Sequence, residues 1–388
     1  MTQPTRAEYD QVMIPCYKPA DLVMTHGKKC RLYDSQNRSY LDFGGGIAVN
    51  SLGNAPKIVR KALKAQSAKL CHISNVFTND ATLKLAKRLT SLTGFDRVFF
   101  TNSGAESNEA ALKLARRTAF DDYGEQKDEI ISFTHSFHGR TFFTVCVGGQ
   151  DKYSSGFGPR PGAITHLPFN DIGAFEKQIS DRTCAVIFEP VQGEGGVRPI
   201  GQEFASCLQE VCRKHDLLLM ADEVQLGNGR SGSLYGYMNY GLQPDVVSTA
   251  KGIGGGLPLG VTMFGERVAD VFHPGDHGTT FGGNPVCCAG AVNILSRIDD
   301  RLLEGVRERS DYLRRTLQAA PGIRSVTGMG LMLGLEIDIP AREFAERALR
   351  EGVLVTTAKQ KIRLLPALNI PMELLKTAAQ ALVHCAAE

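Results

Sequence analysis

The segment Asp245–Gly260, DVVSTAKGIGGGLPLG, places one lysine between a short apolar run and a cluster of glycines. We predict that residues 245–249 form a buried strand and that Lys251 stands at its carboxyl end. Ligands of α/β sheets bind at the carboxyl ends of strands, and glycines let a bulky ligand lie against the backbone. A partly desolvated lysine has a lowered pKa and can act as a Schiff-base nucleophile. Taken alone, a lysine in such a loop is more often an ordinary surface residue.

Short apolar runs alternate with helical patterns on both sides of this segment. Short strands separated by helices are typical of a largely parallel sheet that is covered on both faces. The sequence therefore predicts an α/β domain over residues 48–288. The expected strands are 97–101, 129–133, 184–188, 217–221, 245–249 and 260–264, and the expected helices include 105–117 and 203–214.

The two ends of the chain have a different pattern. Residues 1–47 predict a short β-rich segment that joins a smaller domain, with KCRLYDSQNRSYLDF (29–43) as a hairpin. Residues 289–388 predict that smaller α+β domain. Its expected elements are a helix at 292–318, a strand near 331–337, a helix at 342–351 that ends at Gly352, two further strands and a closing helix at 372–384.

The composition excludes several functional classes. The 44 basic and 41 acidic residues nearly cancel, so nothing predicts nucleic-acid binding through phosphate neutralisation. The N-terminal sequence has no apolar core of the kind a signal peptide needs, and no apolar run is long enough to span a membrane. The ten cysteines include no CxxC pair, which predicts no metal site and favours reduced thiols in a cytoplasmic protein.

Two further segments place charged or polar groups at strand ends. Asp222 follows the apolar run 217–221, where its carboxylate suits the protonated nitrogen of a pyridine ring, although a helix cap or an ion-pair role is the commoner use. The segment TNSGAESN (101–108) joins a strand to a helix, and Ser103 with Glu106 fits a capping box. The backbone N–H groups of Gly104 and Ala105 would then face an anion such as a phosphate.

Candidate partners for a flat, anionic ligand lie elsewhere in the chain. In FHGRT (137–141), Phe137 would stack on a ring and Arg140 would fork onto a carboxylate, whereas simple packing and a surface arginine are the ordinary alternatives. Glu194 lies in a glycine-rich turn after a strand, and Arg363 lies in the tail domain. The segment GTTFGGNP (278–285) offers threonine hydroxyls to a phosphate or carboxylate.

Together these segments resemble the class III, pyridoxal-phosphate-dependent aminotransferases of fold type I, from about Tyr33 to Pro366. The strongest motifs are FFTNSGAESNEAALKLAR, FHGRT, EPVQGEGGV, ADEVQ, STAKGIGGGLPLG and TTFGGNP. LDFGGGIAV and SFHGRTFFTVCVGGQDKYSSGFGP are similar to the acetylornithine aminotransferase branch, which includes the succinylornithine enzymes. The resemblance implies a mostly parallel large domain, a smaller α+β domain and the cofactor pyridoxal 5′-phosphate.

The resemblance also implies a role for each matching residue. Lys251 would carry the cofactor and move the proton, and Asp222 would pair with the ring nitrogen. Thr280 would reach the phosphate in the neighbouring subunit, so the active sites would be shared across a homodimer. The implied cofactor-binding residues are Gly104, Ala105, Phe137, Asp222, Glu223, Val224, Gln225, Lys251 and Thr280.

The implied substrate residues are Arg140, Glu194, Thr279, Arg363 and Tyr17. Arg140 would hold a substrate carboxylate, Thr279 would lie near the substrate, and Tyr17 would line the donor pocket. Glu194 and Arg363 would form a switch. Paired, they leave room for the ω-amino donor; separated, they free Arg363 for the α-carboxylate of 2-oxoglutarate or glutamate.

The implied reaction moves the ω-amino group of N-acetylornithine to 2-oxoglutarate, giving N-acetylglutamate semialdehyde and glutamate in arginine metabolism. Leu226, Asn228 and Asn54 depart from the family pattern and leave the donor open among acetylornithine, succinylornithine, ornithine and 4-aminobutyrate. An aminomutase, an NAD-dependent dehydrogenase and a non-catalytic binding protein are the remaining alternatives. The dehydrogenase would need a GxGxxG turn after a first strand, which SGAES and GEGGV do not provide.

Overall fold

The strands predicted around Lys251 form one seven-stranded sheet. The structure is a computed structural model that describes residues 5–387. The strand order is β4-β12-β11-β10-β7-β5-β6; β12 is antiparallel to both neighbours, and the other adjacent pairs are parallel. The α/β class is confirmed, with one reversed strand in the sheet. The strands are β4 (Arg97–Thr101), β5 (Glu129–Phe133), β6 (Ile164–Leu167), β7 (Thr183–Phe188), β10 (Leu218–Asp222), β11 (Val246–Thr249) and β12 (Gly260–Phe264).

Helices cover both faces of this sheet because its strands are apolar on both sides. Alternate residues of a strand point to opposite faces. Leu219 and Ala221 of β10 therefore pack on one face of the sheet, whereas Leu218 and Met220 pack on the other. The helices on the first face include α4 (Asp80–Thr93), α9 (Gln202–Lys214) and α10 (Pro285–Leu295), and those on the second face are α5 (Gly104–Tyr123) and α6 (Phe142–Val147). The two faces together form the core of the seven-stranded sheet.

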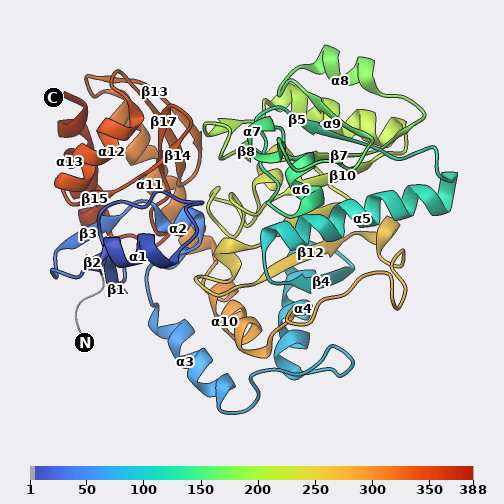
Figure 1. Ribbon diagram of the computed structural model, residues 1–388, viewed down its shortest axis with the longest axis horizontal. Helices are drawn as coiled ribbons and strands as arrows, with labels where there is room; N and C mark the ends of the chain where they lie inside the picture. Colours follow the sequence, from blue (N-terminus) through green and yellow to red (C-terminus); the bar gives the residue numbers. More distant parts are fainter. Residues whose placement is uncertain (1–4, 388) are drawn as a thin grey trace.

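A second core joins the two ends of the chain. Figure 1 shows the red C-terminal elements and the blue N-terminal strands on the same side of the molecule. One four-stranded sheet has the order β13-β14-β17-β16, and in another, β15 pairs in parallel with β3. The strands are β1 (Met24–Lys28), β2 (Arg31–Asp34), β3 (Ser39–Asp42), β13 (Ile323–Met329), β14 (Met332–Ile337), β15 (Val353–Leu354), β16 (Thr356–Ala358) and β17 (Lys361–Leu364), with helices α11 (Asp300–Gln318), α12 (Ala341–Arg350) and α13 (Met372–Ala387). The predicted domain boundaries remain a prediction, and residues 1–4 and 388 lie outside the described part of the chain.

Two expectations for the C-terminal region are wrong. The single helix expected at 292–318 is two helices, because Asn284 caps an earlier start at Pro285 and Asp299 caps a new helix with a hydrogen bond to Leu302 N. The region also holds β13 and three short strands after α12, where the sequence predicted two. The predicted hairpin at 29–43 is present as the antiparallel pair β2 and β3.

Buried polar contacts tie the two cores together beside the lysine segment. Arg230, 1% exposed, donates to Leu331 O and to Pro366 O, each at 2.9 Å. Ser51 Oγ donates to Gly252 O at 2.8 Å. The Ser51 contact holds the backbone next to Lys251 against the N-terminal part of the chain, and the Arg230 contacts hold the loop after β10 against the C-terminal part.

The remaining elements join these layers, and two of them, the helices at 57–67 and 172–178, also pack in the core of the seven-stranded sheet through Val59 and Phe175. Within residues 5–387, no helix combines the length and apolarity that crossing a membrane would take. These elements are α1 (Arg6–Val12), α2 (Gly45–Ala48), α3 (Lys57–Ser67), α7 (Asp151–Ser154), α8 (Ile172–Gln178), β8 (Val191–Gln192), β9 (Arg198–Pro199) and the 3₁₀ turns η1 (Gly236–Tyr240), η2 (Lys251–Ile253) and η3 (Glu266–Val268).

Candidate active site

A cavity of about 540 Å³ opens where β10 and β11 end. Its walls come from the start of α5, the loop after β5, the loop after β10 and the segment after β11. It therefore brings together most of the residues that the sequence predicted as a site. The predicted residues that line it are Gly104, Ala105, Phe137, Arg140, Asp222, Val224, Gln225 and Lys251.

Lys251 occupies a strained backbone position just after the C-terminal end of β11. Its φ of 46° lies in the left-handed region, which a lysine rarely adopts and which the surrounding structure must enforce. Burial lowers the pKa of its ammonium group and Arg363 lowers it further, against the opposing effects of Glu194, Asp222 and Glu189. A lowered pKa increases the fraction of neutral amine, which is the nucleophilic and proton-accepting form.

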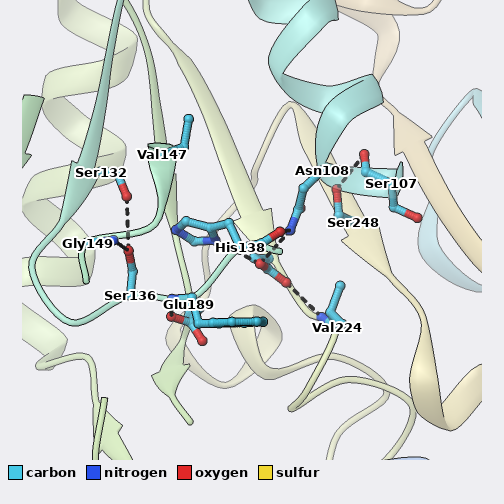
Figure 2. A network of polar contacts seen from close by, with 12 residues as sticks. Ser107, Asn108, Ser132, Ser136, His138, Val147, Gly149, Glu189, Val224 and Ser248 are labelled. Carbon is cyan, nitrogen blue, oxygen red and sulfur yellow. Dashed lines mark hydrogen bonds and ion pairs between the residues drawn. The ribbon is translucent and has the colours of Figure 1, made fainter. Parts of the chain in front are cut away.

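Three residues contact the buried carboxylate of Asp222 and hold it in one orientation; two of them, Asn108 and His138, lie close together in Figure 2, and the third is Val224. Asn108 Nδ2 and His138 Nδ1 each lie 2.8 Å from Asp222 Oδ2, and Val224 N donates to Oδ1 at 3.0 Å. A His138 that donates to this carboxylate carries its proton on Nδ1. A carboxylate fixed in this way presents negative charge to the cavity, as a protonated ring nitrogen requires.

Asn108 and His138 are functional residues that the sequence analysis did not select. Both lie inside quoted motifs, TNSGAESN and FHGRT, yet the motifs do not reveal which side chains turn toward Asp222. Glu189 is a third such residue: it lines the cavity and accepts a hydrogen bond from Phe137 N at 3.0 Å. Burial, followed by the charge of Asp222, raises the pKa of Glu189 well above its ordinary value.

The first turn of α5 faces the cavity with backbone N–H groups. Gly104 and Ala105 are the first two helical residues, so their N–H groups have no carbonyl partner within the helix. Such a turn attracts anions, and phosphate above all. The approach is close: a Cβ on Gly104 would lie 2.5 Å from a methyl carbon of Val224, so only glycine fits there.

The predicted capping box is only half formed. Ser103 Oγ accepts a hydrogen bond from Glu106 N at 3.2 Å, as predicted. The Glu106 carboxylate, however, accepts from Asn102 N at 2.7 Å rather than from Ser103 N. Because it bonds to Asn102 N, the Glu106 side chain lies on the Asn102 side of the turn, and Asn102 itself lines the cavity.

Glu194 and Arg363 form an ion pair that is hydrogen-bonded to Gln225; the Arg363 side chain is buried and that of Glu194 is 22% exposed. Arg363, 1% exposed, pairs with Glu194 and also donates to Gln225 Oε1 at 2.9 Å and to Thr356 Oγ1 at 3.2 Å. Burial alone raises the pKa of Glu194, but the charge of Arg363 and its hydrogen bond outweigh that effect and lower it. The pair joins the turn after β8 to β17, and so it spans both cores.

Six predicted site residues do not line the cavity: Glu194 and Arg363 of the ion pair, Glu223, Tyr17, Thr279 and Thr280. Glu223 follows Asp222, but its side chain points away from the cavity, and its Oε1 accepts a hydrogen bond from Tyr237 N at 2.7 Å; its contact with the cofactor stays a prediction. Tyr17 has an exposed fraction of 80%. Thr280 is exposed, whereas Thr279 Oγ1 accepts from Asn102 Nδ2 at 3.3 Å and so lies next to the cavity wall.

The departures from the family pattern have distinct places. Asn228 Nδ2 donates to Thr249 Oγ1 at 2.9 Å and to Ala250 O at 3.2 Å, so it holds the two residues before Lys251. Leu226 is buried in an apolar cluster. Asn54 Nδ2 donates to Asp42 Oδ2 at 3.0 Å, away from the cavity. Of the three, Asn228 bears most directly on the lysine.

Comparison with known proteins identifies the family. A family model described as "Aminotransferase class-III" matches residues 13–386. The chain belongs to the class III aminotransferases, and the resemblance inferred from the motifs is confirmed, together with pyridoxal 5′-phosphate as the cofactor. The dehydrogenase alternative is thereby excluded.

Three relatives illustrate the similarity. The chain is 48% identical to the acetylornithine aminotransferase of Vibrio vulnificus (strain YJ016), over 94% of this chain and 93% of that protein. It is 47% identical to the succinylornithine transaminase of Photorhabdus laumondii subsp. laumondii, over 94% and 93% respectively. The crystal structure of N-acetylornithine aminotransferase from Stenotrophomonas maltophilia K279a superposes with a TM-score of 0.84 at 34% identity, covering 95% of this chain and 96% of that chain.

Proposed function

We propose that the protein transfers the ω-amino group of N-acetylornithine to 2-oxoglutarate, forming N-acetylglutamate semialdehyde and glutamate in arginine biosynthesis. One observation carries the proposal: Lys251 and Asp222 line one cavity, and the Glu194–Arg363 pair is hydrogen-bonded to Gln225 in the wall of that cavity. The first two residues suit a pyridoxal enzyme, and the pair gives it two states, one for each substrate.

The residues of the cavity fit pyridoxal 5′-phosphate. The first turn of α5 at Gly104 and Ala105 would hold the phosphate, Phe137 would pack on the ring, and Asp222 would hold the ring nitrogen. When bound, the cofactor acts as an electron sink for the amine-bearing carbon. The neutral amine of Lys251 would take the proton from that carbon and return it.

Two arginines would sort the substrates. Arg140 lines the cavity and would hold the α-carboxylate of the acylated donor. While Glu194 neutralises Arg363, the far end of the cavity suits the uncharged chain that leads to the ω-amine. When Glu194 swings away, Arg363 would bind the α-carboxylate of 2-oxoglutarate.

The site would be completed by a second copy of the chain. Asn75 Nδ2 donates to Thr279 O at 3.0 Å and to Gly282 O at 3.1 Å, which joins the segment around residue 75 to the Thr280 loop. This surface exposes Val76, Phe77 and Phe281 by 83%, 64% and 60%. Large apolar side chains gathered at a surface favour a protein interface. A homodimer would bring Thr280 to the partner's phosphate.

The location would be the cytoplasm. The cysteines between residues 16 and 288 are free thiols, and seven of the ten cysteines of the chain are buried. Unpaired cysteines in this number are typical of a reducing compartment.

The decisive experiment is an amine panel with 2-oxoglutarate, using the wild-type enzyme and Lys251→Ala. We expect turnover of N-acetylornithine above free ornithine and 4-aminobutyrate, and loss of both activity and the visible absorbance of the bound cofactor in Lys251→Ala. A preference for free ornithine would overturn the donor assignment. Turnover without any 2-oxo acid would indicate an aminomutase.

A further inference from the structure

The loop that carries Arg140 is attached to helix α5 at three points. Asn108 Nδ2 donates to His138 O at 2.8 Å. Gly139 lies so close to the first turn of α5 that a Cβ on it would stand 2.7 Å from a side-chain carbon of that turn, and its φ of 140° also favours glycine. The third contact comes from Glu109, the residue after Asn108 on α5, and it reaches the segment directly after Arg140.

Glu109 caps helix α6 from outside that helix. The N-cap residue of α6 is Thr141, but its side chain makes no capping hydrogen bond. Its hydroxyl instead donates to Glu109 Oε1, and the same oxygen accepts from Phe143 N and Thr144 N, each at 3.3 Å. These N–H groups belong to the second and third residues of α6, which an N-cap side chain ordinarily binds. The carboxylate of α5 thus replaces the cap, and its negative charge is favourable at a helix N-terminus.

Few other contacts fix Arg140. Its side chain is exposed and lines the cavity, and within residues 5–387 it forms no ion pair. Its Cζ lies 3.8 Å from the ring centroid of Tyr153 and 5.6 Å from that of Phe137. A ring face attracts a cation without fixing the direction of its N–H groups, whereas a bidentate bond to a carboxylate requires that direction. The aim of the guanidinium therefore depends on the backbone of its loop.

We propose that Glu109 is a positioning residue for substrate binding: by capping α6, it fixes the backbone that aims Arg140 at a substrate carboxylate. The contacts of Asn108 and Gly139 hold the loop before Arg140, and those of Glu109 hold it afterwards. Without the Glu109 carboxylate, Thr141 and the first turn of α6 lose their shared acceptor, so the loop is held on one side only. The inference rests on the proposed function, which assigns the substrate carboxylate to Arg140.

The test is a double-mutant cycle between Glu109 and Arg140, with N-acetylornithine and 2-oxoglutarate as substrates. A side chain that acts through Arg140 loses its effect once Arg140 is replaced, whereas a purely structural effect persists. We expect Glu109→Ala alone to lower kcat/KM for N-acetylornithine about tenfold, chiefly through KM, and less than about twofold when Arg140→Met is already present. Glu109→Gln keeps an acceptor oxygen without the charge, so we expect a loss of only about two- to threefold.

Calorimetric binding of glutarate supplies a readout that needs no turnover. Glutarate carries the two carboxylates of 2-oxoglutarate but lacks the reacting carbonyl. We expect its dissociation constant to rise about tenfold in Glu109→Ala and to change less than about twofold when that substitution is added to Arg140→Met. The matched control is Asp171→Ala, which removes the carboxylate that caps α8 by accepting from Ala174 N at 2.9 Å, and which should leave both measurements unchanged.

The cycle has a clear failing outcome. Equal losses from Glu109→Ala with and without Arg140 would show a structural role only and would overturn the proposal. Absence of N-acetylornithine turnover in the wild-type enzyme would instead refute the proposed function. In that case the glutarate measurements would still decide whether Glu109 acts through Arg140, so the two failures are distinguishable.

Discussion

Replacing Glu194 by Gln tests whether the buried pair is a substrate switch. Arg363 would lose its ionic partner but keep Gln225 Oε1 and Thr356 Oγ1 as acceptors at 2.9 and 3.2 Å. Its guanidinium would thus stay in place with an unneutralised charge. We therefore expect an arginine that is open to a carboxylate in both half-reactions.

The expected change in affinity for 2-oxoglutarate follows from the free energy needed to separate Glu194 from Arg363. A hydrogen bond to a charged group contributes about 1.5–3 kcal/mol, and each 1.4 kcal/mol is a factor of ten. In wild type, 2-oxoglutarate has to displace Glu194 before it gains that interaction with Arg363. Removing the competitor should lower the KM for 2-oxoglutarate about tenfold to hundredfold. It should also raise kcat/KM for glutamate as a donor relative to N-acetylornithine by a similar factor.

Single-turnover measurements of each half-reaction, followed through the visible absorbance of the cofactor, separate the two effects. The control is Glu336→Gln, which removes the acid from an exposed pair with Arg324 at 3.6 Å and should leave both half-reactions unchanged. A weaker or unaltered affinity for 2-oxoglutarate in Glu194→Gln would refute the switch. A lower thermal stability alone would not, because the variant leaves a buried charge without its partner.

Two further predictions concern the buried groups around Asp222. Asn108→Ala removes a hydrogen bond to the Asp222 carboxylate and another to His138 O, both 2.8 Å long. Titration of the apoenzyme with the cofactor should therefore show binding that is about tenfold to hundredfold weaker. Equal affinity for the cofactor would contradict the role of Asn108. Burial raises the pKa of Glu223 from 4.5 to about 7. Between these pH values the folded protein keeps a proton that the unfolded chain releases. The free energy of unfolding therefore falls by about 3 kcal/mol as the pH rises through this range. Glu223→Gln should remove this pH-dependent loss of stability when the free energy of unfolding is measured with urea at several pH values. The same loss in the variant would contradict the assignment to Glu223.

Much of the site was predictable because its residues stand at strand ends in the sequence. Lys251 and Asp222 follow buried strands, and parallel strands bring their carboxyl ends to one edge of a sheet. Asn108 and His138 escaped prediction because their contacts with Asp222 span 114 and 84 residues. No local pattern shows which side chain of a helix or loop meets a carboxylate so far away.

The errors have physical causes too. The sequence could not show that the side chain of Glu223 turns away from that of Asp222 and toward Tyr237, which it does because successive side chains in extended backbone point to opposite sides. The continuous apolar pattern across 292–318 concealed a helix break, which the capping side chain of Asp299 produces. The strand β13 was missed because its half-buried residues end in Gly328 and Met329, a weak β pattern.

The residues of the site come from both cores of the molecule, and each core supplies a different kind of group. Lys251 and Asp222 stand on the rigid seven-stranded sheet, where buried strands on either side hold them in place. Arg363 comes from β17 in the other core, and its contacts with Glu194 and Gln225 link it to the wall of the cavity. The catalytic groups are thus fixed, whereas the charge that Arg363 offers to a substrate depends on whether Glu194 is paired with it. An enzyme that must accept two differently charged substrates in turn gains from that division, because opening the pair changes the charge of the cavity without moving the lysine.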